Sequence, residues 1–110
     1  MAFKVLFLAH APDAKSDKHR CMVDTGKYKL FVNVVKGQSE ALQVCQHLVN
    51  EEDIHSILLC PGFTHGDIAE IAEVVGPNVG IFVARGDPPS TKGSMEVMAR
   101  EGWFTPVNNY

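Results

Sequence analysis

The stretch from Ser56 to Gly76 constrains the fold of this chain most tightly. It begins with a short apolar run, passes through a turn at 60–64 and continues as an amphipathic segment. Thr64 and Asp67 have the spacing of a capping box, and Gly76 followed by proline is a typical helix end. Between these signals, apolar side chains recur at helical spacing: Ile68, Ala69, Ile71, Ala72 and Val75. The stretch therefore predicts a buried strand, a tight turn and a helix.

Short apolar runs and helical patterns alternate along the rest of the chain. Apolar or β-branched runs predict strands over 3–9, 29–35, 55–60 and 79–84. Helical spacing predicts helices over 17–23, over 40–50 with Ser39 as the N-cap, after Thr64, and over 94–101. Strands that alternate with helices are typical of right-handed βαβ units and a parallel sheet.

We therefore expect one α/β domain over 1–110 with three αβα layers. Its sheet should have four mostly parallel strands in the flavodoxin-like, or Rossmann-like, order 2-1-3-4. If segment 17–23 is a loop instead of a helix, the second strand can pair antiparallel at an edge. We expect segment 88–110, with its Trp103-Phe104 pair, to pack on the domain or on a neighbouring subunit.

Composition narrows the function classes. The 110 residues carry a formal net charge of −3 and no basic run, so we expect neither a nucleic-acid partner nor a membrane surface. The apolar runs are too short to span a bilayer. Three cysteines without a Cys-x-x-Cys pair indicate free thiols, and we expect a cytoplasmic protein. Surface scaling predicts roughly 6,000 Å² of exposed surface for a compact monomer of this size.

The predicted topology places a candidate site at the carboxyl edge of the sheet. Ligands bind there in open parallel sheets, where the strand order reverses. The first and third strands end at His10 and Cys60, and the fourth strand is followed by Arg85 and Asp87. These side chains should therefore converge.

One interpretation of this edge is a binding site for a small anion. Gly62 allows a ligand to approach the turn, and the helix N-terminus after Thr64 favours negative charge. Arg85 is suited to a bidentate contact with a carboxylate or phosphate, and Asp87 lies beside it. The alternative is that Gly62 only permits the turn and that Arg85 forms an ion pair with Asp87 or Glu96.

A second interpretation is cysteine and histidine chemistry. Cys60 precedes a helix N-terminus, where a thiolate is stabilised, and His65 or His10 would be the acid or base. The alternative is a buried, inert thiol at the end of a strand. His19 and Arg20, in the first loop, either fold over the same edge as ligand-binding residues or stay solvated. No recognised metal-ligand spacing occurs, and no cofactor motif is present.

The same residues resemble a known family. The matching pieces are Ala11-Pro12-Asp13, Lys18-His19-Arg20, Cys60-x-Gly62-Phe63, Ile68-Ala69-x-Ile71-x-Glu73-x-Val75-Gly76 and Ala84-Arg85-x-Asp87. Together they resemble a family of small bacterial and archaeal proteins that is catalogued only as a domain of unknown function. The resemblance runs to about Asp87; Pro61 and Gly86 stand where relatives often have Gly and Phe. It implies no activity, cofactor or substrate.

These observations leave three hypotheses for function. The first is a small-molecule binding protein with an anionic ligand at the carboxyl edge of the sheet. The second is a non-catalytic module for oligomerisation or protein interaction, since a thin sheet has exposed edges that proteins often cover by pairing. The third is a small cysteine- and histidine-dependent enzyme. A homo-oligomer is expected under the first two.

Overall fold

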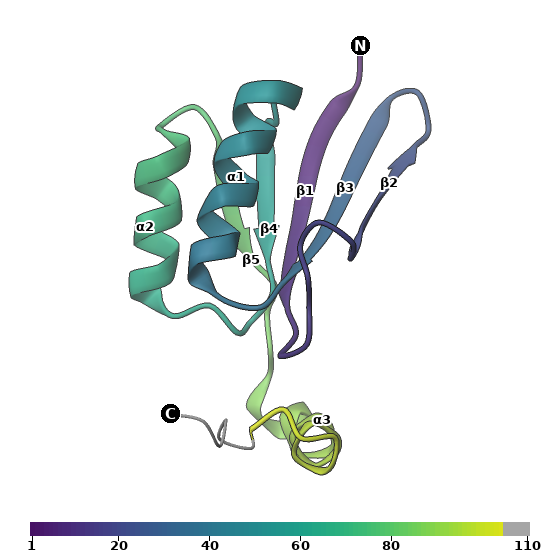
Figure 1. Ribbon diagram of the computed structural model, residues 1–110, viewed down its shortest axis with the longest axis vertical. Helices are drawn as coiled ribbons and strands as arrows, with labels where there is room; N and C mark the ends of the chain where they lie inside the picture. The colour runs from purple at the N-terminus through teal and green to yellow at the C-terminus, as the bar shows by residue number, and fades with distance from the viewer. Residues whose placement is uncertain (105–110) are drawn as a thin grey trace.

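The computed structural model describes residues 1–104 as a mixed α/β fold, with one five-stranded sheet and three helices (Figure 1). The elements along the chain are β1 (Phe3–His10), β2 (Arg20–Asp24), β3 (Tyr28–Val35), α1 (Gln38–Glu52), β4 (Ser56–Leu59), α2 (His65–Val75), β5 (Gly80–Val83) and α3 (Pro88–Arg100). The sheet order is β2-β3-β1-β4-β5. All pairs are parallel except β2 with β3.

The sheet has one strand more than the sequence predicted. The four expected strands occur in it as β3-β1-β4-β5, but the predicted count of four was wrong. The helix predicted over 17–23 was also wrong, because Arg20–Asp24 is an antiparallel edge strand. The turn at Gly26 explains this difference: its φ is 99°, and its N–H donates to Asp24 Oδ1 at 2.8 Å. This turn folds β2 back along β3 as a hairpin.

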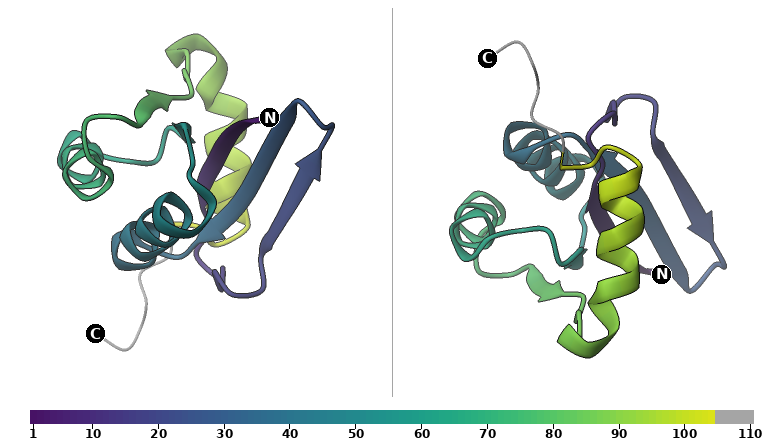
Figure 2. Two further views of the ribbon diagram at one scale, coloured as in Figure 1. Left: turned by 90° about the horizontal axis from the view of Figure 1, so that it is seen from above. Right: turned by 90° about the horizontal axis from the view of Figure 1, so that it is seen from below.

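The fold has two layers where we expected three. Helices α1 and α2 lie side by side on the same face of the sheet (Figures 1 and 2). The connections from β3 to β4 and from β4 to β5 run in the same direction across the sheet, so right-handed crossovers put both helices on one face. The opposite face would need a helix between β1 and β3. That connection is a loop and strand β2 instead.

The hydrophobic core fills the space between the sheet and these two helices. It contains alternate side chains of β1, β3 and β4 together with residues of both helices and their connections: Leu6, Leu8, Val35, Ala41, Cys45, Ile54, Ile57, Leu59, Phe63, Ile71 and Val75. Alternation along the strands explains why neighbours such as Phe7 and Leu58 are absent from this cluster. Their side chains point to the other face.

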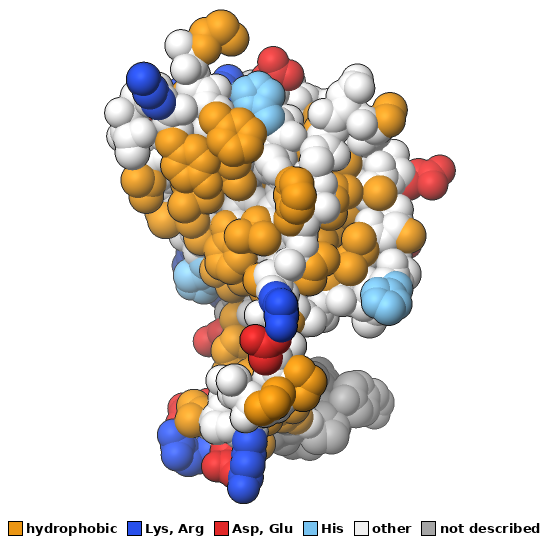
Figure 3. Space-filling view, turned by 180° about the vertical axis from the view of Figure 1, so that it is seen from behind, with side chains coloured by type: hydrophobic (Ala, Val, Ile, Leu, Met, Phe, Trp, Pro, Cys, Tyr) orange, Lys and Arg blue, Asp and Glu red, His pale blue; other side chains and the backbone are white. Residues whose placement is uncertain are grey.

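That other face, which we call the open sheet face, carries no helix. Strand alternation and register assign to it Phe3, Val5, Phe7, Cys21, Val23, Tyr28, Leu30, Val32, Val34, Leu58 and Phe82. Figure 3 shows hydrophobic side chains spread across this side of the molecule. Phe82 is 61 % exposed and Phe3 is 53 % exposed. The register places no charged residue of the five strands on this face.

Helix α3 stands apart from the two layers. It begins at Pro88, earlier than the predicted 94–101, because proline is favoured at the first helical positions. It lies beyond the carboxyl ends of the strands (Figures 1 and 2) and has no buried residue. Residues 105–110 lie outside the described part, and the packing of segment 88–110 on the domain or on a neighbouring subunit stays a prediction. None of the helices in residues 1–104 has the length and apolar character needed to cross a membrane.

Candidate functional site

The carboxyl edge of the sheet brings together the side chains of His10 and Cys60. His10 is the last residue of β1, and Cys60 directly follows β4, the neighbouring parallel strand. The Cys60 N–H donates to Leu8 O at 3.0 Å, which holds the start of the turn against β1. As a result, Cys60 Sγ lies 4.0 Å from His10 Nδ1. The topology predicted that His10 and Cys60 converge at this edge, and either His65 or His10 was considered as the acid or base; of these two, His10 is the one in contact with the thiol.

The turn after Cys60 packs closely against this pair. A Cβ atom on Gly62 would lie 3.2 Å from His10 Nδ1 and 3.6 Å from Cys60 Sγ. On the other side, the rings of His10 and Phe63 have centroids 4.0 Å apart. Phe63 is itself buried in the core. Gly62 therefore does more than permit a turn, because its missing side chain makes room for the imidazole beside the thiol.

Burial sets the protonation of His10. The half-buried imidazole has its pKa lowered from the ordinary 6.5 by desolvation, and the nearby negative charge of Asp67 partly opposes that shift. His10 is therefore neutral at neutral pH, the form that can accept a proton. The arrangement can support transfer of the Cys60 proton to His10 Nδ1.

The N-terminus of α2 already holds an anionic group of the protein. Thr64 Oγ1 accepts from the Asp67 N–H at 3.0 Å, and Asp67 Oδ2 accepts from the Thr64 N–H at 3.0 Å. This reciprocal capping box confirms the one predicted from the sequence. The Asp67 carboxylate thus interacts with the end of the helix where an anionic ligand was predicted.

Arg85, the cation predicted to bind a ligand at this site, forms an ion pair with Asp87. Arg85 Nε lies 2.6 Å from Asp87 Oδ1 in an exposed ion pair, with side-chain exposures of 86 % and 53 %. This is the pairing that we considered as the alternative. His65 is also exposed, in the first turn of α2. Binding of a ligand by Arg85, Asp87, Gly62 or Thr64 stays a prediction.

The other two predicted ligand-binding residues make different contacts. His19 Nδ1 accepts from the Lys15 N–H at 2.9 Å, which closes a turn of the first loop. Arg20 begins β2 and lines a groove between α1 and the β2–β3 hairpin. Neither residue has a described hydrogen bond to His10 or Cys60. Their role in binding likewise stays a prediction.

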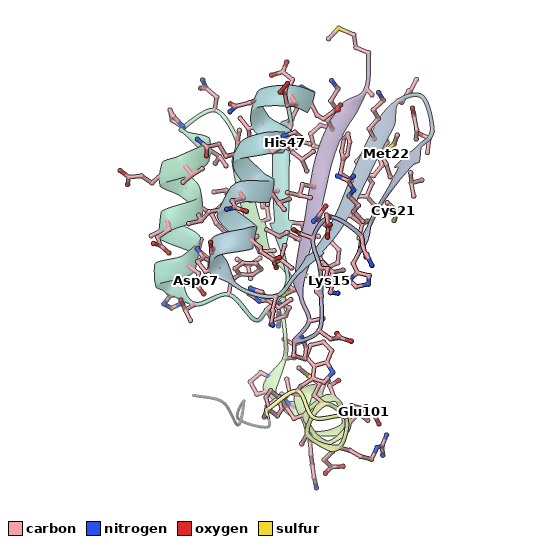
Figure 4. All side chains as sticks on the ribbon, in the orientation of Figure 1. Lys15, Cys21, Met22, His47, Asp67 and Glu101 are labelled. Atoms are coloured by element: carbon pink, nitrogen blue, oxygen red, sulfur yellow. The ribbon has the colours of Figure 1, made fainter. Side chains whose placement is uncertain are left out.

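The groove itself was not predicted. It has a volume of about 520 Å³, and it is lined by Arg20, Met22, Asn33 and His47 among others. Figure 4 shows His47 on α1 and Met22 on β2 on its two sides. It exists because β2 and β3 extend beyond the edge of α1. The groove was missed because a helix was predicted over 17–23. Only the alternation of side-chain types over 20–24, which is typical of a strand, could have indicated it.

No metal centre is apparent in the described part of the chain. Within residues 1–104, no three His, Cys, Asp or Glu side chains are grouped so that they could hold an ion. The polar side chains described at the carboxyl edge are thus the thiol–imidazole pair, the capping box of α2 and the exposed Arg85–Asp87 ion pair.

Comparison with known proteins identifies a family whose function is unknown. The model of a family described as "Family of unknown function (DUF6506)" matches residues 3–99. No curated protein matches the sequence, and no solved structure matches it.

Proposed function

We propose that this chain, which belongs to this family of unknown function, is a self-associating domain whose open sheet face is covered by a second copy. The observation that carries this proposal is the face itself. It spans all five strands, and its side chains are apolar except for Ser56 and the hydroxyl group of Tyr28. Contiguous apolar patches of this kind mark interaction surfaces in proteins.

The total exposed surface supports the same proposal. The chain exposes 7552 Å². A compact monomer of this mass would expose roughly 6,000 Å². Helix α3, which has no buried residue, contributes to this difference as well as the open sheet face. Half of the difference equals the roughly 800 Å² that each partner of a standard dimer buries. A face without charges also favours an apolar partner, and another copy of this chain presents such a surface.

The anionic-ligand hypothesis has less support. Arg85 is paired with Asp87, and Asp67 places a carboxylate at the N-terminus of α2. An anion bound there would have to displace one of these interactions. That hypothesis depends on Arg85 and on the N-terminus of α2, and each of these groups already has an interaction within the protein.

Light scattering coupled to size exclusion tests self-association over a range of concentrations. We expect the wild-type chain to be a dimer and Phe82→Asp to be a monomer, because the charge would be buried in the interface. Val74→Asp is the matched control: Val74 is an exposed apolar residue, 37 % accessible, on helix α2 instead of the open sheet face. A monomeric wild type at every concentration, or equal dissociation of both variants, would refute the proposal.

The contact between Cys60 and His10 favours a second candidate function, a reactive thiol. In that reaction the Cys60 sulfur forms a bond to an electrophilic carbon, the leaving group departs with its bonding electrons, and His10 Nδ1 accepts the thiol proton. The support is the 4.0 Å separation and the neutral state of the half-buried imidazole. The three free cysteines provide the internal comparison.

Alkylation by iodoacetamide, followed by peptide mass spectrometry, measures the reactivity of each thiol. Cys45 should react slowest in the folded protein, since burial raises its pKa to about 12. We expect Cys60 to react faster than the exposed Cys21. His10→Gln should slow Cys60 by about tenfold, somewhat below the roughly 10²-fold effect of a positioned general base in an enzyme. An unchanged rate in His10→Gln would exclude this function.

A further inference from the structure

We propose that the cover of the open sheet face is helix α3 of the second copy, so that two chains exchange their C-terminal helices. This inference rests on the proposed self-association and names the element that performs it. One chain carries both halves of such a contact. The open sheet face carries no helix, and α3 has no buried residue.

Helix α3 needs a partner to be stable. It has 13 residues, none of them buried, and Gly93 lies in its interior. Isolated helices shorter than roughly 12–15 residues are marginal in water even when they are rich in alanine, and glycine lowers their stability further. The helix therefore obtains its stability from packing that the isolated chain does not provide.

The surface of α3 is amphipathic. Met95, Met98 and Ala99 have the spacing i, i+3, i+4 and form one apolar stripe. Met95 is 49 % exposed. Glu96 and Arg100 lie away from this stripe on the helix. Methionine side chains adapt to irregular apolar surfaces, so the stripe fits a face built from Phe, Val and Leu side chains.

The connector before α3 directs the helix away from its own sheet face. The Ala84 N–H donates to Leu59 O at 2.7 Å, which fixes the start of the connector against β4. Asp87 has an extended backbone, and two prolines follow it and restrict φ at the start of the helix. Gly86 lies near the side chain of Pro61. With this geometry α3 lies beyond the carboxyl ends of the strands instead of beside the open sheet face (Figures 1 and 2).

The dimensions of α3 suit the face of a partner. A helix of 13 residues is about 20 Å long and about 10 Å wide with its side chains. Neighbouring strands are about 4.8 Å apart, so one helix covers the width of about two strands. An eight-residue strand such as β1 is about 26 Å long and accommodates the full helix. Each exchanged helix would supply part of the third layer that the fold lacks.

Point variants of the full chain test the exchange by light scattering. We expect Met95→Asp and Met98→Asp each to raise the dimer dissociation constant by about tenfold or more, as loss of an apolar anchor does at an interface. Glu96→Gln is the matched control on another side of the same helix, and it should leave the constant unchanged. If Phe82→Asp dissociates the dimer while both methionine variants behave like the control, self-association stands and the helix exchange is refuted.

Amide hydrogen–deuterium exchange of the wild-type chain distinguishes a swap of α3 between two copies from docking of α3 on its own domain. In an exchanged dimer the amides of α3 are protected at high concentration and lose protection on dilution below the dissociation constant. Protection that does not change with concentration would show that the helix docks within its own chain. Absence of protection at every concentration would show that it docks nowhere. Either of these two results would overturn the proposal.

Discussion

Cys60 Sγ lies 4.0 Å from His10 Nδ1, although 50 positions separate the two residues in the sequence. The contact arises because β1 and β4 are adjacent parallel strands that end at the same edge. Gly62 leaves the space that the imidazole occupies, and Phe63 supports the other side of the ring. The pair therefore depends on the turn as much as on the two strands.

Substitution of Gly62 tests this dependence. In Gly62→Ala the new methyl group would lie 3.2 Å from His10 Nδ1, so the imidazole has to move. We expect a loss of about 1 kcal/mol in the free energy of unfolding, at the low end of overpacking effects, measured by urea denaturation. Gly93→Ala is the control, because its methyl group would meet no atom within 4 Å, and it should not lower stability. Equal losses in both variants would contradict the proposed role of Gly62.

The lowered pKa of His10 predicts a pH dependence of stability. Because burial lowers the pKa of His10 in the folded protein below 6.5, His10 binds a proton more readily in the unfolded chain. Stability should therefore fall as the pH drops through about 6.5 toward the lower pKa of the folded state. His10→Gln should remove this part of the decline. Urea denaturation at pH 7.5 and pH 5.5 measures it, and identical pH profiles for both proteins would disprove the prediction.

The capping box of α2 predicts a stability effect at Thr64. Thr64→Ala removes the side-chain acceptor of the Asp67 N–H, and we expect a loss of about 1 kcal/mol, the usual cost of deleting an N-cap. The control is Thr91→Ala in α3, whose exposed hydroxyl donates only to Pro88 O at 2.8 Å. That variant should change the free energy of unfolding by less than about 0.5 kcal/mol. Thermal and urea unfolding measure the loss of stability in each variant. A larger loss in Thr91→Ala than in Thr64→Ala would contradict the assignment.

The exposed ion pair predicts that Arg85 is dispensable for stability. Arg85→Ala should change the free energy of unfolding by less than about 1 kcal/mol, as for other surface pairs. Because Arg85 is engaged with Asp87, we also expect titration of the wild-type chain with inorganic phosphate to release no measurable heat. Saturable phosphate binding that disappears in Arg85→Ala would instead restore the anionic-ligand hypothesis.

Individual strands and the capping box could be predicted because the residues that specify them are close together in the sequence. Four strands were located from their apolar runs, and the capping box at Thr64 and Asp67 was identified from its spacing. The convergence of His10 and Cys60 followed from the parallel topology. Strand β2 was missed because its five residues are all exposed and its apolar run, Cys21 to Val23, is short and lies between Arg20 and Asp24. The groove beside α1 was missed with it.

The amino-acid sequence by itself indicated four of the five strands, helices α1 and α2 and the convergence of His10 with Cys60, because periodicity, caps and strand ends depend on residues that are close together in the chain. Only the tertiary structure decided how those elements are layered. The direction of the two crossovers placed α1 and α2 on one face, and the absence of a helix between β1 and β3 left the other face open. The connector at 84–87 then carried α3 away from that face. These are relations between distant segments, and no local pattern encodes them.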